Sequence, residues 1–112
     1  METVNFITLS LTIHLNSSKC SATWFNVGLG SCGVVNVNSD FIVALSTVEM
    51  AGGASCGRQI RVNFIDQGRS VVATVRDTCP SCSQFSIDLS PAAFQALASL
   101  DVGRIQVEWD FI

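Results

Sequence analysis

The chain has 112 residues, of which 48% are hydrophobic and 13% are charged, and its formal net charge is −3. This length and composition are typical of one folded domain with a modest core, and they exclude a disordered chain. The six basic residues are scattered, which excludes a basic stripe, so we expect no nucleic-acid partner.

The N-terminal segment 6–15 is apolar but too short to span a bilayer, and we expect no membrane attachment. Apolar and polar residues alternate strictly from Ile7 to Leu15, which predicts a strand whose polar face carries a solvated His14. We interpret residues 1–19 as an N-terminal extension that forms an extra strand, with a signal-peptide remnant as the alternative. The sequon that starts at Asn16 agrees with secretion.

Residues 20–112 are expected to form one domain of short strands with one helix. A glycine-rich turn is expected over 28–33, and a helical turn followed by a glycine-rich loop over 47–55. Periodicity predicts strands at 21–27, at 41–46 (apolar throughout, as in a buried strand), at 59–66 and 70–77 (a β-hairpin), and at 104–112. Because closure removes exposed sheet edges, a small β-barrel is the natural arrangement of these strands.

A helix is predicted over 91–100. Ser90 is suited to cap it, because its hydroxyl can accept from free N–H groups of the first turn, and Pro91 suits the first helical position. Asp88 therefore lies just before a helix whose N-terminal end favours a carboxylate. Either a site role or a purely structural role fits Asp88 on this pattern.

The five cysteines in so short a chain indicate an oxidising compartment, which predicts a secreted protein. We favour the pairs Cys32–Cys56 and Cys79–Cys82, although the sequence permits other pairings. Because five is an odd number, one thiol remains, and Cys20 stands apart from the other four.

The Cys79-Pro80-Ser81-Cys82 motif has two further interpretations. A redox pair would open a helix inside a βαβ unit, whereas this motif follows a hairpin strand. A zinc site would need a second close pair of ligands, which the sequence lacks. We therefore expect structural disulfides, no metal and no cofactor.

Several motifs, taken in order, resemble those of the secreted double-psi β-barrel proteins, which include rare lipoprotein A-like domains, expansins, barwin and the small fungal expansin-like loosenins. The resemblance covers about residues 20–112 and is closest to the loosenins. It rests on GLGSCG (28–33), DFIVALS (40–46), CGxxI (56–60), SVVATVRDTCPSC (70–82) and IDLSPAAF (87–94). It implies a mainly β fold, a six-stranded double-psi β-barrel with one or two short helices.

The resemblance also implies a shallow polysaccharide groove whose polar residues are here Thr23, Asp77 and Asp88. An aromatic residue of some bacterial relatives is replaced by Cys79. The histidine before the catalytic aspartate of related family-45 endoglucanases is absent, because Ser86 and Ile87 stand there, and no residue matches the catalytic base of those enzymes.

These observations predict a monomeric protein that binds cell-wall polysaccharide without hydrolysis. Asp77 and Asp88 would accept hydrogen bonds from sugar hydroxyls, and Trp24 or Phe25 would offer an apolar face to a pyranose ring. Trp109, in the last strand, is expected in the core. The alternative function is a protease inhibitor or another protein-binding barrel, which would present an exposed loop, such as 47–55. Weak glycoside hydrolysis by paired carboxylates is the third possibility.

Overall fold

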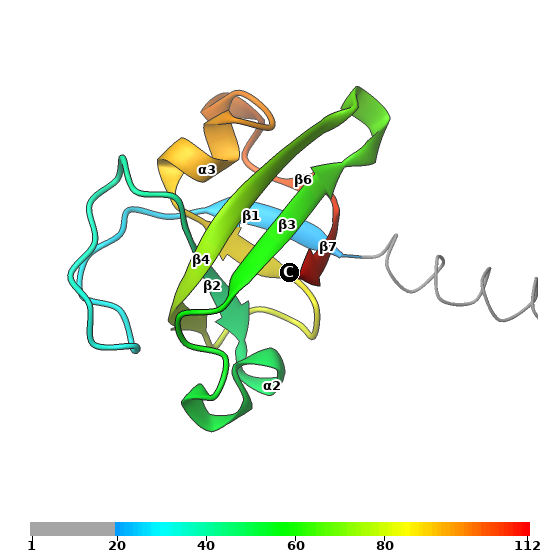
Figure 1. Ribbon diagram of the computed structural model, residues 1–112. Coiled ribbons are helices and arrows are strands. Elements are labelled where there is room, and N and C mark those ends of the chain that lie inside the picture. The colour runs from blue at the N-terminus through cyan, green and yellow to red at the C-terminus, as the bar shows by residue number, and fades with distance from the viewer. Residues whose placement is uncertain (1–19) are drawn as a thin grey trace, which may run out of the picture.

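The computed structural model describes residues 20–112, so the predicted extension 1–19, with its strand, His14 and sequon, lies outside the described residues. The described chain is mainly β, with a few short helices (Figure 1). Its strands are β1 (Ser21–Trp24), β2 (Ile42–Ser46), β3 (Gln59–Phe64), β4 (Arg69–Cys79), β5 (Ile87–Leu89), β6 (Ile105–Gln106) and β7 (Glu108–Phe111). Its helical segments are α2 (Thr47–Met50), η1 (Ala51–Gly53), η2 (Ile65–Gln67), α3 (Pro91–Gln95) and η3 (Leu100–Val102).

The strands form one sheet in the order β6-β1-β5-β2-β4-β3-β7. Two pairs are parallel, β1 with β5 and β2 with β4, and the other neighbours are antiparallel. The two edge strands, β6 and β7, are consecutive in the chain, and only Val107 separates them. The sheet edges are thus joined through one residue, which gives the expected barrel.

The strands in the middle of the chain match their predictions. Strand β2 is buried at all five positions, as the apolar run predicts for a strand covered on both faces. Strands β3 and β4 form the predicted hairpin, and Gly68 in the turn between them adopts φ 62°, which favours glycine. On β4, side chains alternate across the sheet, and Val71, Ala73 and Val75 face the core.

The barrel has seven strands rather than six. Periodicity predicts five of them, since β5 has only three residues and too few positions to show alternation, and the predicted strand 104–112 divides at Val107. Strand β6 pairs with β1, whereas β7 pairs with β3, so the two halves of this segment serve opposite edges of the sheet. Neither half alone has a periodicity that would mark such a division.

The helix predicted over 91–100 is also shorter, because α3 ends at Gln95. The Ala96 N–H bonds to the carbonyls of both Ala92 and Ala93, and the Leu97 N–H bonds to that of Phe94, so the last turn tightens. The backbone becomes extended at Ser99, the N-cap residue of η3.

The predicted cap of α3 is confirmed, and it has a wider role than capping. The Ser90 hydroxyl accepts from the Ala93 N–H at 3.3 Å and from the Ile42 N–H at 3.2 Å, and it donates to the Asp40 carbonyl at 2.6 Å. This fully buried side chain therefore joins the start of α3 to the start of β2.

The core fills the barrel interior and extends under α3. Its fully buried large side chains include Phe94, Leu45, Ile60, Ile87, Leu89 and Leu97. Trp109, predicted in the core, is partly buried and packs against it, and its ring meets Phe111 edge-on with 5.3 Å between centroids.

Candidate binding groove

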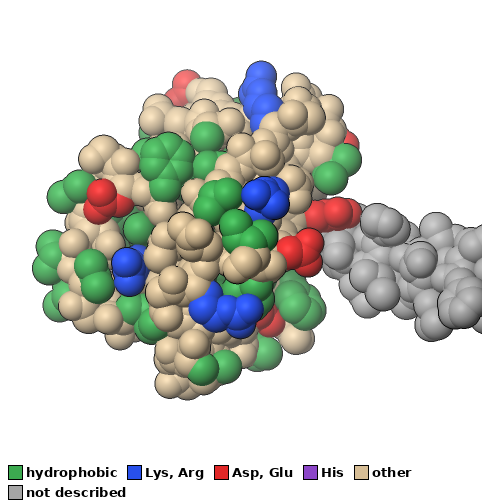
Figure 2. All heavy atoms as spheres, viewed as in Figure 1, with side chains coloured by type: hydrophobic (Ala, Val, Ile, Leu, Met, Phe, Trp, Pro, Cys, Tyr) green, Lys and Arg blue, Asp and Glu red, His purple; other side chains and the backbone are tan. Residues whose placement is uncertain are grey.

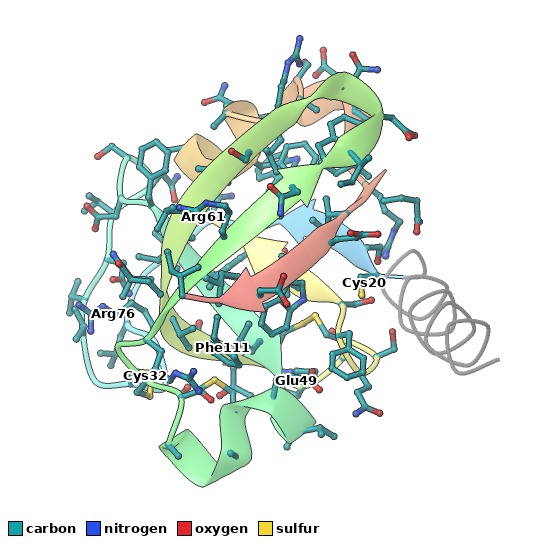
Figure 3. All side chains as sticks on the ribbon, turned by 45° about the vertical axis from the view of Figure 1, so that its right-hand side comes forward. Cys20, Cys32, Glu49, Arg61, Arg76 and Phe111 are labelled. Carbon is teal, nitrogen blue, oxygen red and sulfur yellow. A yellow bond between two sulfur atoms is a disulfide. The ribbon has the colours of Figure 1, made fainter. Side chains whose placement is uncertain are left out.

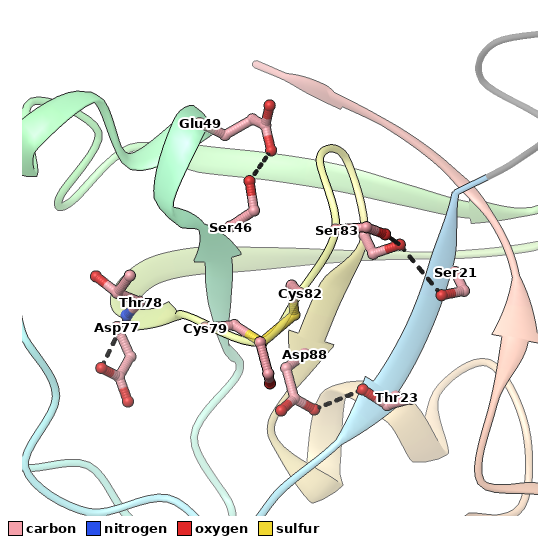
Figure 4. Close-up of a disulfide and its surroundings, with 12 residues drawn as sticks. Ser21, Thr23, Ser46, Glu49, Asp77, Thr78, Cys79, Cys82, Ser83 and Asp88 are labelled. Carbon is pink, nitrogen blue, oxygen red and sulfur yellow. Dashed lines mark hydrogen bonds between the residues drawn. A yellow bond between two sulfur atoms is a disulfide. The ribbon is translucent and has the colours of Figure 1, made fainter.

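The barrel places Thr23, Asp88 and Asp77 in one row across neighbouring strands. Thr23 on β1 lies opposite Asp88 on β5, and Ala44 on β2 is in register with both Asp88 and Asp77. The two aspartates therefore flank one small residue, with Cα atoms about 10 Å apart because adjacent strands are separated by about 4.8 Å. Figure 4 shows both carboxylates on the same side of the sheet.

Asp88 is half-buried, and its carboxylate accepts a hydrogen bond from the Thr23 hydroxyl at 2.9 Å. Burial raises the pKa of Asp88 above its ordinary value, because it disfavours the charged form. The Thr23 hydrogen bond and the Arg104 charge oppose this rise in pKa, whereas the negative charge of Asp77 adds to it. The two carboxylates therefore lie close enough for the charge of one to repel that of the other.

Asp77 is held by backbone donors. Its Oδ1 accepts from the Ser31 N–H at 2.9 Å and from its neighbour Thr78 N–H at 2.8 Å. The Ser31 donor comes from the predicted glycine-rich turn, which approaches β4 so closely that a Cβ on Gly30 would lie 2.2 Å from the Arg76 carbonyl oxygen. Glycine at position 30 therefore allows the loop to hold the Asp77 carboxylate.

A cleft of about 200 Å³ lies beside the Thr23–Asp88 end of this row. Its polar lining includes Asp88, Thr23 and Arg104, whose guanidinium donates to the Ser21 hydroxyl at 2.9 Å. Both cysteines of the Cys79–Cys82 disulfide line the same cleft. A second cleft, of about 260 Å³, is lined by Ser31 and Thr78, the two residues whose N–H groups bind Asp77. A polar cleft is therefore lined by Asp88, whereas the cleft beside the residues that hold Asp77 is more apolar.

The disulfide pairing predicted from the sequence is confirmed. Cys32 bonds to Cys56, and Cys79 bonds to Cys82 across the turn that follows β4. The first bridge ties the glycine-rich turn to the segment before β3, and the second closes the wall of the cleft beside Asp88 (Figure 4). Cys20 lies outside both bridges and is buried.

The structure separates Trp24 from the row of polar residues. Side chains alternate along β1, so Trp24 faces away from Thr23 and packs against the core, where its indole N–H donates to the Leu100 carbonyl at 3.0 Å. Phe25 follows β1, is half-buried, and continues the pairing through its N–H to the Leu89 carbonyl at 3.0 Å. By the same alternation, Phe25 is the predicted aromatic residue on Thr23's side of the strand.

Three contributors to the groove were not found by sequence reasoning, namely Ser31, Thr78 and Arg104. Ser31 lies within the glycine-rich turn, which the sequence marks only as a turn, and Arg104 is one of the six scattered basic residues. Ser31 and Thr78 lie 46 and 1 positions from Asp77, and Arg104 lies 16 positions from Asp88. These separations follow no common spacing that would predict a shared site.

Among residues 20–112, no group of three or more histidine, cysteine or acidic side chains is placed to hold a metal ion. No helix in the same range is long and apolar enough to cross a membrane.

A family model described as lytic transglycolase matches residues 17–109. The chain belongs to this double-psi β-barrel family. The sequence-based resemblance is thereby confirmed, and so is the fold class.

Solved structures of the family include an expansin and an inhibitor. An aspartate-to-asparagine mutant of the Clavibacter michiganensis expansin, in complex with cellohexaose, superimposes with a TM-score of 0.75 and 28% identity over 83% of this chain and 48% of that chain. The Streptomyces papain inhibitor superimposes with a TM-score of 0.72 and 33% identity over 82% of this chain and 90% of that chain.

Sequence relatives include the papain inhibitor of Streptomyces mobaraensis, which is 36% identical over 91 residues, 76% of this chain and 64% of that protein. A ripening-related protein of Oryza sativa subsp. japonica is 40% identical over 88 residues, 73% of this chain and 53% of that protein. The chain thus spans between half and two thirds of the length of these curated relatives. An inhibitor and an expansin among the relatives agree with the prediction of a binding protein rather than an enzyme, although the family description names an enzymatic activity.

Proposed function

We propose that this double-psi β-barrel binds cell-wall polysaccharide along the row formed by Thr23, Asp88 and Asp77. The observation that carries the proposal is the placement of two aspartates, with Cα atoms about 10 Å apart, on one side of the sheet; Asp88 lines a polar cleft, and a second cleft is lined by the residues that hold Asp77. Polysaccharide chains present many hydroxyl donors at regular intervals. Two fixed acceptors with adjoining clefts match such a ligand better than they match a small compact molecule.

The proposed action is binding that loosens contacts between polymer chains, without cleavage of a glycosidic bond. Glycoside hydrolysis normally needs one protonated carboxylic acid and a second carboxylate that acts as base or nucleophile. Asp88, with its raised pKa, has one property of an acid. Two backbone N–H groups bind Oδ1 of Asp77 and leave Oδ2 for a ligand hydroxyl, and the sequence has no counterpart of the catalytic base of family-45 endoglucanases. Hydroxyl groups of a polymer can still hydrogen-bond to both carboxylates, in place of bonds between neighbouring polymer chains.

The relatives support this proposal, and so do the disulfides. The mutant expansin is in complex with cellohexaose in its solved structure, and it is 28% identical to this chain over the part that aligns, which is 83% of this chain and 48% of the expansin. The two disulfides fit an oxidising compartment, so we place the protein outside the cell, where wall polymers lie.

Binding isotherms on insoluble cellulose, chitin and β-glucan test the proposal. Asp88→Asn and Asp77→Asn keep the side-chain shape but remove the charge, and each should weaken retention about tenfold, as expected for loss of a charge-assisted hydrogen bond. Asp66→Asn, an exposed acid on η2, is the matched control and should bind like the wild type.

Two results would contradict the proposal. One is that the wild-type protein is retained on none of the three polymers. The other is that purified protein releases soluble reducing sugars and that Asp77→Asn abolishes the release, which would identify a hydrolase instead.

Cysteine-protease inhibition is the second candidate, and exposed apolar side chains favour it. The loop between β1 and β2 exposes Leu29 (72%), Val35 (73%) and Val37 (57%), and Figure 2 shows hydrophobic side chains along that edge of the molecule. The loop is held in shape by the Cys32–Cys56 disulfide and by the buried Asn36 amide, which donates to two loop carbonyls. Rigid apolar loops are suited to protein contacts. The predicted loop 47–55 also exposes an apolar residue, Val48 (62%).

A papain assay separates the two candidates. Under the inhibitor hypothesis, Leu29→Ser with Val35→Ser abolishes inhibition and leaves polysaccharide retention unchanged. Under the polysaccharide hypothesis, the wild-type protein has no effect on papain.

A further inference from the structure

Phe85 occupies a backbone position that an aromatic residue rarely adopts. The Ser86 N–H bonds to the Ser83 carbonyl at 3.0 Å, which closes a four-residue β-turn with Phe85 at its third position. Phe85 has φ 68°, whereas Gln84 has no positive φ, and this combination is that of a type II turn. The third position of that turn normally carries glycine, because a Cβ is disfavoured there. Phe85 is thus strained relative to glycine.

Two side chains from distant elements hold Phe85 in this conformation. The Glu49 carboxylate, on α2, accepts from the Phe85 N–H at 2.9 Å. The Trp109 indole N–H, on β7, donates to the Phe85 carbonyl at 2.8 Å. Glu49 is itself oriented by the Ser46 hydroxyl (Figure 4), and Figure 3 places it at the end of the barrel where β7 carries Phe111. The strained residue is therefore fixed on both of its backbone polar groups.

The phenyl ring of Phe85 does not contribute to the core. It is 44% exposed and is absent from the buried cluster that fills the barrel. Core packing therefore does not compensate for the strain. Backbone strain that persists without a packing reason is characteristic of functional positions.

The turn that carries Phe85 also forms a wall of the cleft beside Asp88. Ser83 and Ser86, the two ends of the turn, line that cleft, and so do Ser81 and Cys82 just before it. The Ser86 hydroxyl is further tied to β1 through Ser21 at 3.2 Å. The backbone of an exposed aromatic residue is thus fixed in the turn whose two ends line a polar cleft that contains a carboxylate.

We propose that the Phe85 ring is a stacking surface for a pyranose unit at the margin of the Asp88 cleft, which selects polymers of β-1,4-linked pyranoses. This inference rests on the proposed polysaccharide function. In β-1,4-linked glucose and N-acetylglucosamine the hydroxyls are equatorial, so each ring has an apolar C–H face. An aromatic ring covers such a face, while Asp88 accepts from hydroxyls at the ring edge. Polymers of α-linked glucose, which coil, present no continuous flat face.

The test combines sugar binding with thermal unfolding in four variants of the whole chain. Titrations use cellohexaose and chitohexaose, with maltohexaose as the α-linked comparison. Phe85→Gly removes the ring and the strain together, so we expect binding about tenfold weaker and a higher Tm. Phe85→Trp keeps an aromatic face and should bind within about threefold of the wild type. Ile65→Ala, which removes an exposed apolar side chain from η2, is the control, and Asp88→Asn reports on the groove itself.

The outcomes distinguish this inference from the function on which it rests. If Phe85→Gly binds both β-linked hexamers like the wild type while Asp88→Asn weakens binding, the stacking role is wrong and the groove proposal stands. Equal affinity of the wild type for maltohexaose would overturn the β-1,4 selectivity. If the wild type binds none of the sugars and none of the insoluble polymers, both proposals fail. The higher Tm of Phe85→Gly excludes the explanation that weaker binding reflects an unfolded variant.

Discussion

Thr23 and Asp88 lie opposite each other on adjacent parallel strands, and the Thr23 hydroxyl donates to the Asp88 carboxylate at 2.9 Å. Burial raises the pKa of the Asp88 carboxyl group, whereas this hydrogen bond stabilises its charged form and so opposes the rise in pKa. Without the donor, the charged form loses part of its stabilisation. We therefore predict that Thr23→Val raises the pKa of Asp88 further, as measured by NMR titration of the side-chain carboxyl. Thr74→Val on β4 is the control and should leave that pKa unchanged.

The charged form of Asp88 should lower the free energy of unfolding at neutral pH. Its pKa is raised in the folded protein, so the folded state binds the Asp88 proton more tightly than the unfolded state does. The protonated Asp88 side chain therefore stabilises the folded state. This stabilisation is fully present at a pH below the pKa of Asp88 in the unfolded chain, and it is lost as the pH rises through the pKa of Asp88 in the folded protein. Asp88→Asn, whose amide oxygen can still accept from Thr23, should therefore unfold at higher urea concentration than the wild type at pH 7. The difference should shrink as the pH approaches 3, and a constant difference across this range would contradict the assignment.

Gly30 is required by the close approach of its loop to β4. A Cβ at this position would lie 2.2 Å from the Arg76 carbonyl oxygen, so Gly30→Ala must displace the loop and its Ser31 N–H from Asp77. We expect a loss of about 2 kcal/mol in the free energy of unfolding, as for overpacked sites. Gly28→Ala meets no atom within 4 Å and should change stability by less than about 0.5 kcal/mol. Equal effects of the two substitutions in urea unfolding would show that the contact is not limiting.

The two disulfides should differ in what their removal does. Cys32–Cys56 spans 24 positions and Cys79–Cys82 spans 3, so the chain-entropy model predicts losses of about 3–4 and about 2 kcal/mol, respectively. Paired serine substitutions, followed by urea unfolding, measure these losses. Because both cysteines of the shorter bridge line the Asp88 cleft, its removal should weaken polysaccharide retention more than removal of the longer bridge does. The reverse order of the two binding effects would contradict a groove beside Asp88.

Ser90 should matter more to stability than an ordinary helix cap. Ser90→Ala leaves the buried Ile42 N–H without the hydroxyl that it meets at 3.2 Å, in addition to removing the cap of α3. We expect a loss of about 2 kcal/mol, because a cap and a buried donor are affected together. Ser99→Ala removes the exposed cap of η3 and should cost about 0.5 kcal/mol. Thermal unfolding of the two variants tests the contrast, and a Ser90→Ala loss no greater than that of Ser99→Ala would show that the link to β2 contributes nothing.

The sequence by itself determined the elements whose signals are local. The apolar run at 41–46 fixes β2 because both of its faces are buried, and alternation with a glycine turn fixes the β3–β4 hairpin. The start of α3 follows from Ser90 and Pro91, whose chemistry acts within one turn. The order of motifs around Asp77 and Asp88 also indicated the family, and with it which polar residues to compare.

The tertiary structure alone decided how these residues meet. Asp77 and Asp88 flank Ala44 because β2 pairs with β4 on one side and β5 on the other, and nothing in the spacing of the two acids specifies that pairing. The same holds for Trp24, which the pattern left as a binding candidate and which the direction of β1 turns toward the core. Phe85 is the clearest case of a conformation that local sequence does not predict. Its backbone has a positive φ and is held by Glu49 and Trp109, which lie 36 and 24 positions away. Local sequence sets propensities over a few residues, whereas long-range hydrogen bonds and strand pairing determine where side chains converge.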